Sequence, residues 1–359
     1  MSTSLLPFRN NLPQVNPEIP FEGLEGQYGT YIAEPALVHA ANTALGLEMP
    51  LLLTGWPGCG KSDFAWVAAK ALGHDEPLRF HVRSDTRARD LLYSYDALVR
   101  FGDMQHGRHE RAQDPRHYVS LRPLGAALMS PGRRPVVLID EIDKAPRDLP
   151  NDLLHEIDEG RFEIPEIGEL SKDAPRRIWD RIAYLTRRSE HPQLPKGAPP
   201  PIWDRTHTNI ELKRDMKRPP GQLKPLVVIT SNAERQLPEA FLRRCIFFPI
   251  PPPNIEQLIK IAVARFPNQP SELMKSLATV FHAFRESHSF VKTPTTAEML
   301  NWIDALARLY DPSAVQAQMQ DFVNALIQKA KPKWNILPAL GCLLKMEEDF
   351  EIAGARVHA

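Results

Sequence analysis

Residues 55–62 read Gly-Trp-Pro-Gly-Cys-Gly-Lys-Ser and fit the pattern G-x-x-x-x-G-K-[ST]. The apolar run at 50–54 before it predicts a buried strand, and the alanine-rich run at 61–72 after it predicts a helix. A glycine-rich turn between a strand and a helix lets backbone N–H groups close around a phosphate, which also faces the positive end of the helix. This stretch therefore predicts a phosphate-binding loop in an α/β fold.

Each position in this loop has an expected task. Lys61 would reach the β- and γ-phosphates as a compact charge, and the Ser62 hydroxyl would bind Mg²⁺. We therefore expect ATP and Mg²⁺ as cofactors. The residues expected to surround the phosphates with their backbone are Gly55, Pro57, Gly58, Cys59 and Gly60.

The apolar run at 136–139 ends in Asp140 and Glu141. Such an unbroken run is typical of a strand in a parallel sheet that is covered on both faces, and its carboxyl end would lie at the same edge as the phosphate-binding loop. Asp140 is then placed to hold Mg²⁺ through water, and Glu141 to act as the general base that polarises the attacking water.

Three further short runs, at 78–82, 225–230 and 245–248, also predict strands. Strands that alternate with helices predict a doubly wound parallel α/β sheet. Asn232 follows the strand at 225–230. If that strand lies between the loop strand and the acidic strand, Asn232 would orient the attacking water. Arg243 and Arg244 precede the last strand and are candidates to reach the nucleotide of a neighbouring subunit, because a permanent planar charge suits a phosphoryl-transfer transition state.

The prolines at 251–253 end the strand pattern, and the chain from there to about residue 353 has helical periodicity. We expect an extended arm at 1–28, an α/β domain at 29–250 with insertions at about 89–130 and 161–224, and a helical domain at 251–359. Asn254 and Gln257 have the spacing of a helix-capping box.

Composition favours a globular protein without a strong charge bias. The 44 Lys and Arg residues equal the 44 Asp and Glu residues, whereas proteins that coat nucleic acid usually carry a positive excess. We find no apolar run of the length that spans a bilayer, and no basic start followed by an apolar stretch. The chain has three cysteines, and this small, odd number does not indicate a disulfide framework. We therefore expect a protein of the reducing cytoplasm.

The segment 171–219 leaves an alternative open. It holds twelve Lys or Arg residues against six Asp or Glu residues, and Ile-Trp-Asp-Arg occurs in it twice, at 178–181 and 202–205. A connection of this length between strands is typical of a functional insertion. Its positive excess is compatible with an ATP-driven motor that binds nucleic acid.

The ordered set GWPGCGKS, VVLIDEIDKA, ITSN and LPEAFLRRC resembles the AAA+ ATPases of the MoxR group. The resemblance runs from about residue 30 to 305. It implies the strand order 5-1-4-3-2, a helical lid over the nucleotide, a homo-oligomeric ring, usually a hexamer, and chaperone-like remodelling of a partner protein driven by ATP hydrolysis. ATPases of this family are often encoded beside proteins with a von Willebrand A domain, so the resemblance suggests such a protein as a partner. The family's arginine-finger position falls on Arg244, with Arg243 as the second candidate.

One position departs from the family. Its lid commonly carries an arginine that reaches the γ-phosphate, but the matching stretch here, residues 293–298, reads TPTTAE and has Ala297 in that place. Whether Lys292 replaces the arginine stays open. A nucleotide-gated scaffold with slow turnover is therefore a third hypothesis.

Overall fold

The structure is a computed structural model, and it describes residues 25–26, 29–130, 134–168, 210, 212–287, 290–328 and 334–354. The chain forms two compact units. The sheet unit comprises the described parts of Pro35–Leu53 and Ala65–Phe248. The lid unit comprises those of Glu22–Glu34, Thr54–Phe64 and Pro249–Ala359.

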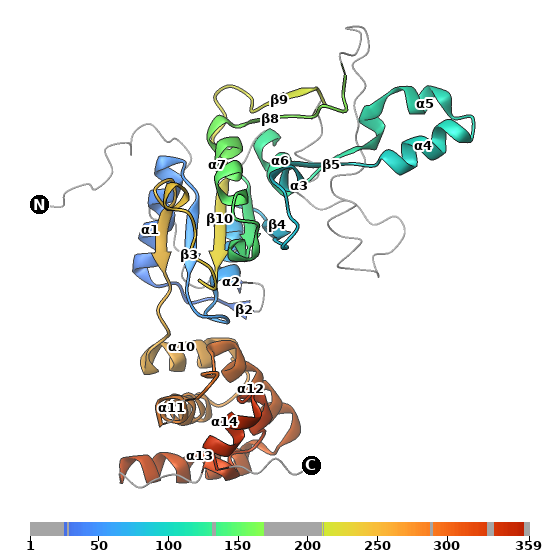
Figure 1. The fold of residues 1–359 in the computed structure, drawn as a ribbon. Coiled ribbons are helices and arrows are strands. Elements are labelled where there is room, and N and C mark those ends of the chain that lie inside the picture. The colour runs from blue at the N-terminus through green and yellow to red at the C-terminus, as the bar shows by residue number, and fades with distance from the viewer. Residues whose placement is uncertain are drawn as a thin grey trace, which may run out of the picture. The chain divides into compact units, whose positions relative to one another are not determined.

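A five-stranded sheet with the order β11-β3-β10-β7-β4 forms the centre of the sheet unit (Figure 1). In chain order these strands are the first to fifth predicted strands, so the expected order 5-1-4-3-2 and the α/β fold class are confirmed. Their bounds are β3 (Leu51–Thr54), β4 (Leu78–His81), β7 (Val136–Asp140), β10 (Leu226–Ser231) and β11 (Ile246–Pro249).

Parallel pairing aligns the central strands. β10 pairs with β7 in a register that sets Leu226 beside Val136 and Ile229 beside Ile139, and β4 pairs with the other side of β7. All six residues of β10 are buried, as expected for a strand covered on both faces. Beside those of the first insertion, the described helices of this part of the chain are α1 (Pro35–Leu47), α2 (Lys61–Ala71), α3 (Ala88–Leu92), α6 (Pro123–Met129), α7 (Leu149–Glu159) and α9 (Glu239–Leu242).

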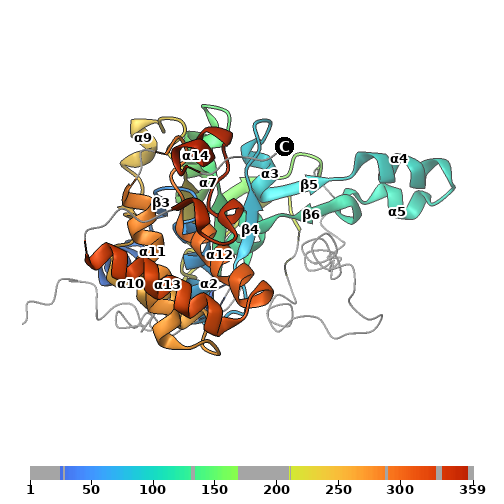
Figure 2. The same cartoon turned by 90° about the horizontal axis from the view of Figure 1, so that it is seen from below.

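The first predicted insertion forms a two-stranded ribbon with a helical tip. β5 (Tyr93–Tyr95) and β6 (Val119–Leu121) pair antiparallel. They lead to α4 (Ala97–Gln105) and α5 (His109–Gln113), which project from the sheet (Figure 2). The 3-10 helix η1 (Pro115–Tyr118) closes the tip.

A buried carboxylate holds this tip together. Asp103 accepts a hydrogen bond from the Tyr118 hydroxyl at 2.8 Å, and its other oxygen lies 3.2 Å from Arg108 Nη1. Charge-assisted bonds of this kind compensate a buried carboxylate for its lost water. The tip is therefore a defined structure and not a loose loop.

Two paired strands lie near the two ends of the second predicted insertion. β8 (Arg161–Glu163) pairs antiparallel with β9 (Asp215–Lys217). Most of the basic segment at 171–219, with both copies of Ile-Trp-Asp-Arg, lies outside the described residues.

The lid unit is helical after residue 253, as the periodicity predicts. At its N-terminal end, β1 (Glu25–Gly26) pairs antiparallel with β2 (Gly29–Thr30); residues 1–24 of the expected arm lie outside the described residues. The helices are α10 (Ile255–Arg265), α11 (Ser271–Ser287), α12 (Thr296–Leu309), α13 (Pro312–Ile327) and α14 (Glu347–Ile352), with the 3-10 helices η4 (Trp334–Ile336) and η5 (Leu340–Cys342).

One predicted detail of the lid unit is confirmed, and a buried tryptophan lies in its core. Asn254 Oδ1 accepts from the Gln257 backbone N–H at 2.9 Å while Gln257 Oε1 accepts from that of Asn254 at 2.8 Å, which is a capping box. Trp302 is fully buried in the apolar core, and its Nε1 donates to the Pro338 carbonyl at 2.7 Å. Among the described residues, we find no helix with the length and apolar character needed to cross a membrane.

Arg134 anchors the beginning of β7. It is 7% exposed; its Nε donates to the Lys224 carbonyl at 2.5 Å and its Nη1 to the Leu45 carbonyl at 2.8 Å. Burial lowers the pKa of Arg134 to about 10, so the guanidinium stays charged at neutral pH. One side chain thus ties β7 to the end of α1 and to the chain that enters β10.

We expect Arg134→Met to lower the free energy of unfolding by about 2–3 kcal/mol, because two buried carbonyls lose a charged donor. Urea denaturation measures the effect. Arg147→Met is the control: Arg147 is exposed, and its replacement should cost less than about 0.5 kcal/mol. Equal unfolding midpoints for the two variants would contradict the anchoring role.

Candidate nucleotide-binding site

The glycine-rich loop connects β3 to α2, and α2 begins at Lys61. Gly58 has a φ of 72°, a conformation that costs other residues about 1–2 kcal/mol. A Cβ atom at Gly58 would also lie 2.7 Å from Thr295 Oγ1 and 2.9 Å from Ala297 Cβ. Both the backbone conformation and the close approach of α12 therefore require glycine here.

Lys61 is buried and its ammonium turns back on the loop. Nζ donates to the carbonyls of Gly55 at 2.8 Å and Trp56 at 2.9 Å. Cys59 Sγ lies 3.8 Å from the same nitrogen, yet burial raises the pKa of the thiol above its ordinary value. The Cys59 side chain is thus an uncharged thiol in the loop, and the positive charge of the loop comes from Lys61.

This set of groups fits a phosphate chain. Phosphate oxygens are stronger acceptors than the two carbonyls that Lys61 binds, so they can take over its ammonium. Ser62 lies in the first turn of α2, at the helix end that attracts anions. Lys61 and Ser62 would hold the phosphates and a bound Mg²⁺, which would neutralise charge on the phosphates.

The acidic pair lies where the sequence predicts, at the carboxyl end of β7. Thr230, near the end of the neighbouring β10, joins the two acids. Its hydroxyl donates to Asp140 Oδ1 at 2.5 Å and accepts from the Glu141 backbone N–H at 2.9 Å. A single buried hydroxyl therefore fixes both the Asp140 carboxylate and the backbone of Glu141.

Glu141 has a left-handed backbone with a φ of 61°, which costs about 1–2 kcal/mol for a non-glycine residue. Both of its carboxylate oxygens have donors. Oε1 lies 3.3 Å from Asn232 Nδ2, whereas Oε2 lies 2.6 Å from Lys144 Nζ and 3.2 Å from His81 Nε2. The bond to Glu141 raises the pKa of Lys144, so Lys144 is a cation at neutral pH.

Asp143 holds the segment that follows β10. Its buried Oδ2 accepts from the backbone N–H groups of Asn232 at 3.1 Å and Glu234 at 3.0 Å. Ala233 between them is also left-handed, with a φ of 59°. The two bonds to a carboxylate stabilise this strained turn and fix where Asn232 leaves the strand.

The two candidate finger arginines lie at the end of α9. Arg243 pairs with Glu239 on the same helix, and Arg244 Nε lies 3.9 Å from Asp158 Oδ2 on α7. Both side chains are more than half exposed, so neither bond holds its arginine firmly. Their action on a neighbouring subunit stays a prediction.

The lid segment that departs from the MoxR pattern has a definite anchor. The fully buried carboxylate of Asp349 accepts from the backbone N–H groups of Val291 at 2.6 Å and Lys292 at 3.1 Å. The Thr295 backbone N–H donates to Glu298 Oε2 at 2.7 Å, as part of a capping box at the start of α12. Ala297 lies against the glycine-rich loop, and Lys292 is exposed.

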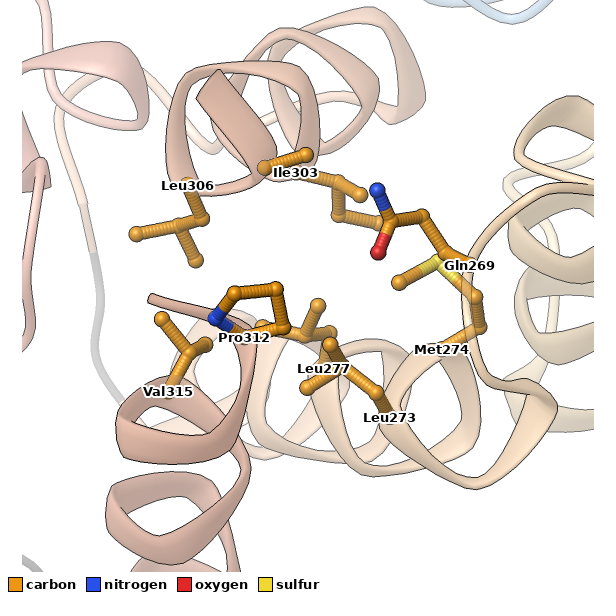
Figure 3. Close-up of a pocket in the computed structure, with 9 residues that line it drawn as sticks. Gln269, Leu273, Met274, Leu277, Ile303, Leu306, Pro312 and Val315 are labelled. Atoms are coloured by element: carbon orange, nitrogen blue, oxygen red, sulfur yellow. The ribbon is translucent and has the colours of Figure 1, made fainter. Parts of the chain in front are cut away.

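A small apolar pocket lies elsewhere in the lid unit, between α11, α12 and the start of α13 (Figure 3). Gln269 brings the one polar side chain to a lining that otherwise consists of residues such as Leu273, Ile303 and Val315. It offers no charged group to a phosphate, so it is not the nucleotide site.

The comparison with known proteins agrees with this geometry. Residues 50–206 match the family model described as AAA domain (dynein-related subfamily). The match supports an AAA+ ATPase domain in this part of the chain, with the nucleotide binding that such domains share. No curated protein gives a significant match. Asn232, Arg243, Arg244 and the helical region after residue 250 lie beyond the matched residues.

Sequence reasoning missed three side chains around the acidic pair, namely His81, Asp143 and Lys144. The i,i+3 spacing of Glu141 and Lys144 is a signal that could have revealed their ion pair. The bonds from Asp143 to the segment after β10 had no such signal, because they join residues about 90 positions apart.

Thr230→Val tests the junction between the two acids. Valine keeps the shape but leaves the Glu141 N–H and one Asp140 oxygen without their buried partner, so we expect a loss of about 1–3 kcal/mol in the free energy of unfolding. Thr230→Ser keeps the hydroxyl, so its free energy of unfolding should fall clearly less than that of Thr230→Val. Urea denaturation of the two variants decides, and equal losses would rule out the hydroxyl as the link.

Proposed function

We propose that this chain is an AAA+ ATPase of the MoxR type, which assembles into a homo-oligomeric ring and uses ATP hydrolysis to remodel a partner protein. One observation supports the proposed ATP hydrolysis most directly. The Glu141 carboxylate at the end of β7 meets the Asn232 amide at the end of β10, and β10 is also the neighbour of the strand that leads into the glycine-rich loop.

In this proposal the groups act in order on one nucleotide. Lys61 and the loop backbone would bind the phosphates, and Ser62 and, through water, Asp140 would hold Mg²⁺, which would neutralise charge on the phosphates. The attacking water, oriented by Asn232, bonds to the γ-phosphorus through its oxygen and gives a proton to Glu141, while the bond to the bridging oxygen breaks. Arg244 of a neighbouring subunit, with Arg243 as the second candidate, stabilises the developing charge.

The tip of the first insertion supports a protein partner. On α4, Leu98 is 84% exposed, Phe101 60% and Met104 48%. Their spacing of three residues sets them along one side of the helix. Solvent-exposed apolar stripes of this kind mark protein interaction sites. The resemblance to the MoxR group makes a von Willebrand A-domain protein a candidate partner.

Two alternatives remain with narrower support. A nucleic-acid motor rests on the basic segment at 171–219, most of which lies outside the described residues. A slow nucleotide-gated scaffold rests on Ala297, which brings no charge to the glycine-rich loop. Rapid phosphate release by the protein without a partner would contradict the scaffold.

We expect Lys61→Ala to abolish ATP binding and Glu141→Gln to keep binding but lower kcat by about 100-fold or more, because the amide cannot take the proton. Nucleotide-binding titrations and phosphate-release assays separate the two effects. Tight ATP binding by Lys61→Ala, or unchanged turnover in Glu141→Gln, would contradict these roles.

The action of Arg244 across subunits has a separate test. Lys61→Ala and Arg244→Ala should each lose turnover, Arg244→Ala by about 1,000-fold or more. When the two proteins are mixed, about a quarter of the interfaces would pair an intact loop with an intact arginine, and activity should return. The same measurements on Arg243→Ala show which of the two arginines acts: the one whose replacement lowers turnover. A mixture as inactive as its components would contradict action in trans.

The partner is best captured with Glu141→Gln, which should hold ATP without splitting it. We expect the variant to retain a protein in an ATP-dependent pull-down, and Leu98→Ser/Phe101→Ser in the same background to retain much less of it. The double change should leave basal ATPase activity of the otherwise unmodified protein intact. Equal capture by both proteins would exclude the α4 stripe as the docking surface.

A further inference from the structure

The surroundings of Glu141 contain a cation that the proposed hydrolysis does not use. Lys144 lies in the 3-10 helix η2 (Ile142–Lys144), directly after the strained Glu141. Its Nζ is 2.6 Å from Glu141 Oε2, slightly shorter than is usual for a charge-assisted N–H···O hydrogen bond. Glu141, the proposed general base, is therefore held by a lysine three residues further along the chain.

This arrangement is unfavourable for a base that must receive the attacking water. The Lys144 ammonium occupies Oε2, so a water molecule has to compete with it for that oxygen. His81 lies beside the same oxygen, and Asn232 takes the other one. To receive a water molecule in good geometry, Glu141 has to exchange at least one of these contacts.

The Lys144 side chain is suited to such an exchange. It is 42% exposed, so water can replace the contact at small cost. Among the described residues, the Glu141 carboxylate is the acceptor of its Nζ, and Lys144 is not part of the buried core of the sheet unit. Asp143, one residue before it, is buried and holds the backbone of Asn232. Asp143 is therefore a permanent anchor, whereas the contact of Lys144 can be released.

We propose that Lys144 is a positioning residue that holds Glu141 in a resting orientation and thereby limits hydrolysis until the contact is released. This inference rests on the proposed ATPase function. It assigns Lys144 no contact with the nucleotide. Release would accompany the changes at the sheet edge that a partner or neighbouring subunit brings about.

The test compares basal kcat and KM for ATP in the unmodified protein and four variants. Lys144→Met should raise kcat by about 3- to 10-fold with little change in KM, because the base is freed and the phosphate contacts stay. Lys144→Arg keeps the charge and should stay near the unmodified protein, and Lys144→Gln should lie between. Lys275→Met is a matched control, since Lys275 forms the same i,i+3 pair at 2.6 Å with Glu272 on α11.

The outcomes separate the two proposals. If the unmodified protein hydrolyses ATP and Glu141→Gln does not, an unchanged or lower kcat in Lys144→Met overturns the restraint and leaves the ATPase assignment standing. A rise shared by Lys275→Met, or by Lys144→Arg to the same extent, overturns it as well. If neither the unmodified protein nor any of the variants hydrolyses ATP, the proposed function itself fails and the restraint fails with it.

Discussion

The parallel pairing of β7 with β10 is the constraint on which the candidate site depends. The register that sets Ile229 beside Ile139 brings the next residues, Thr230 and Asp140, into hydrogen-bond contact. A shift by one residue would turn every side chain to the opposite face of the sheet and separate these groups. Four apolar pairs in the core thus determine where two polar side chains meet at the edge.

Beyond the strands, the site depends on two backbone conformations that cost free energy. Glu141 and Ala233 are both left-handed, and each is compensated nearby. The Thr230 hydroxyl binds the N–H of Glu141, and the Asp143 carboxylate binds the N–H groups on both sides of Ala233. Strain of this kind persists where the surrounding bonds determine the geometry, and it commonly marks functional sites.

The sequence was sufficient for the strands, the glycine-rich loop, the acidic pair and the helical region after residue 253, because each depends on a local pattern. The sheet order was an implication of the resemblance to the MoxR group and not of such a pattern. Periodicity finds strands and helices, and a motif of eight residues defines the loop. The bonds made by Asp143, His81 and Asp349 were not predictable in this way. They join residues 57 or more positions apart, and only the folded chain shows which side chains meet. The proposed action of Arg244 in a neighbouring subunit cannot be read from one chain, because it depends on an assembly.

The ribbon formed by β5 and β6 has a consequence for how such a protein can diversify. Its two strands leave and re-enter the fold side by side, with Tyr93 opposite Leu121, so the segment between them can lengthen, shorten or change sequence without moving the five-stranded sheet. The exposed residues of the tip can therefore change in evolution without altering the contacts between β7 and β10 that form the candidate site.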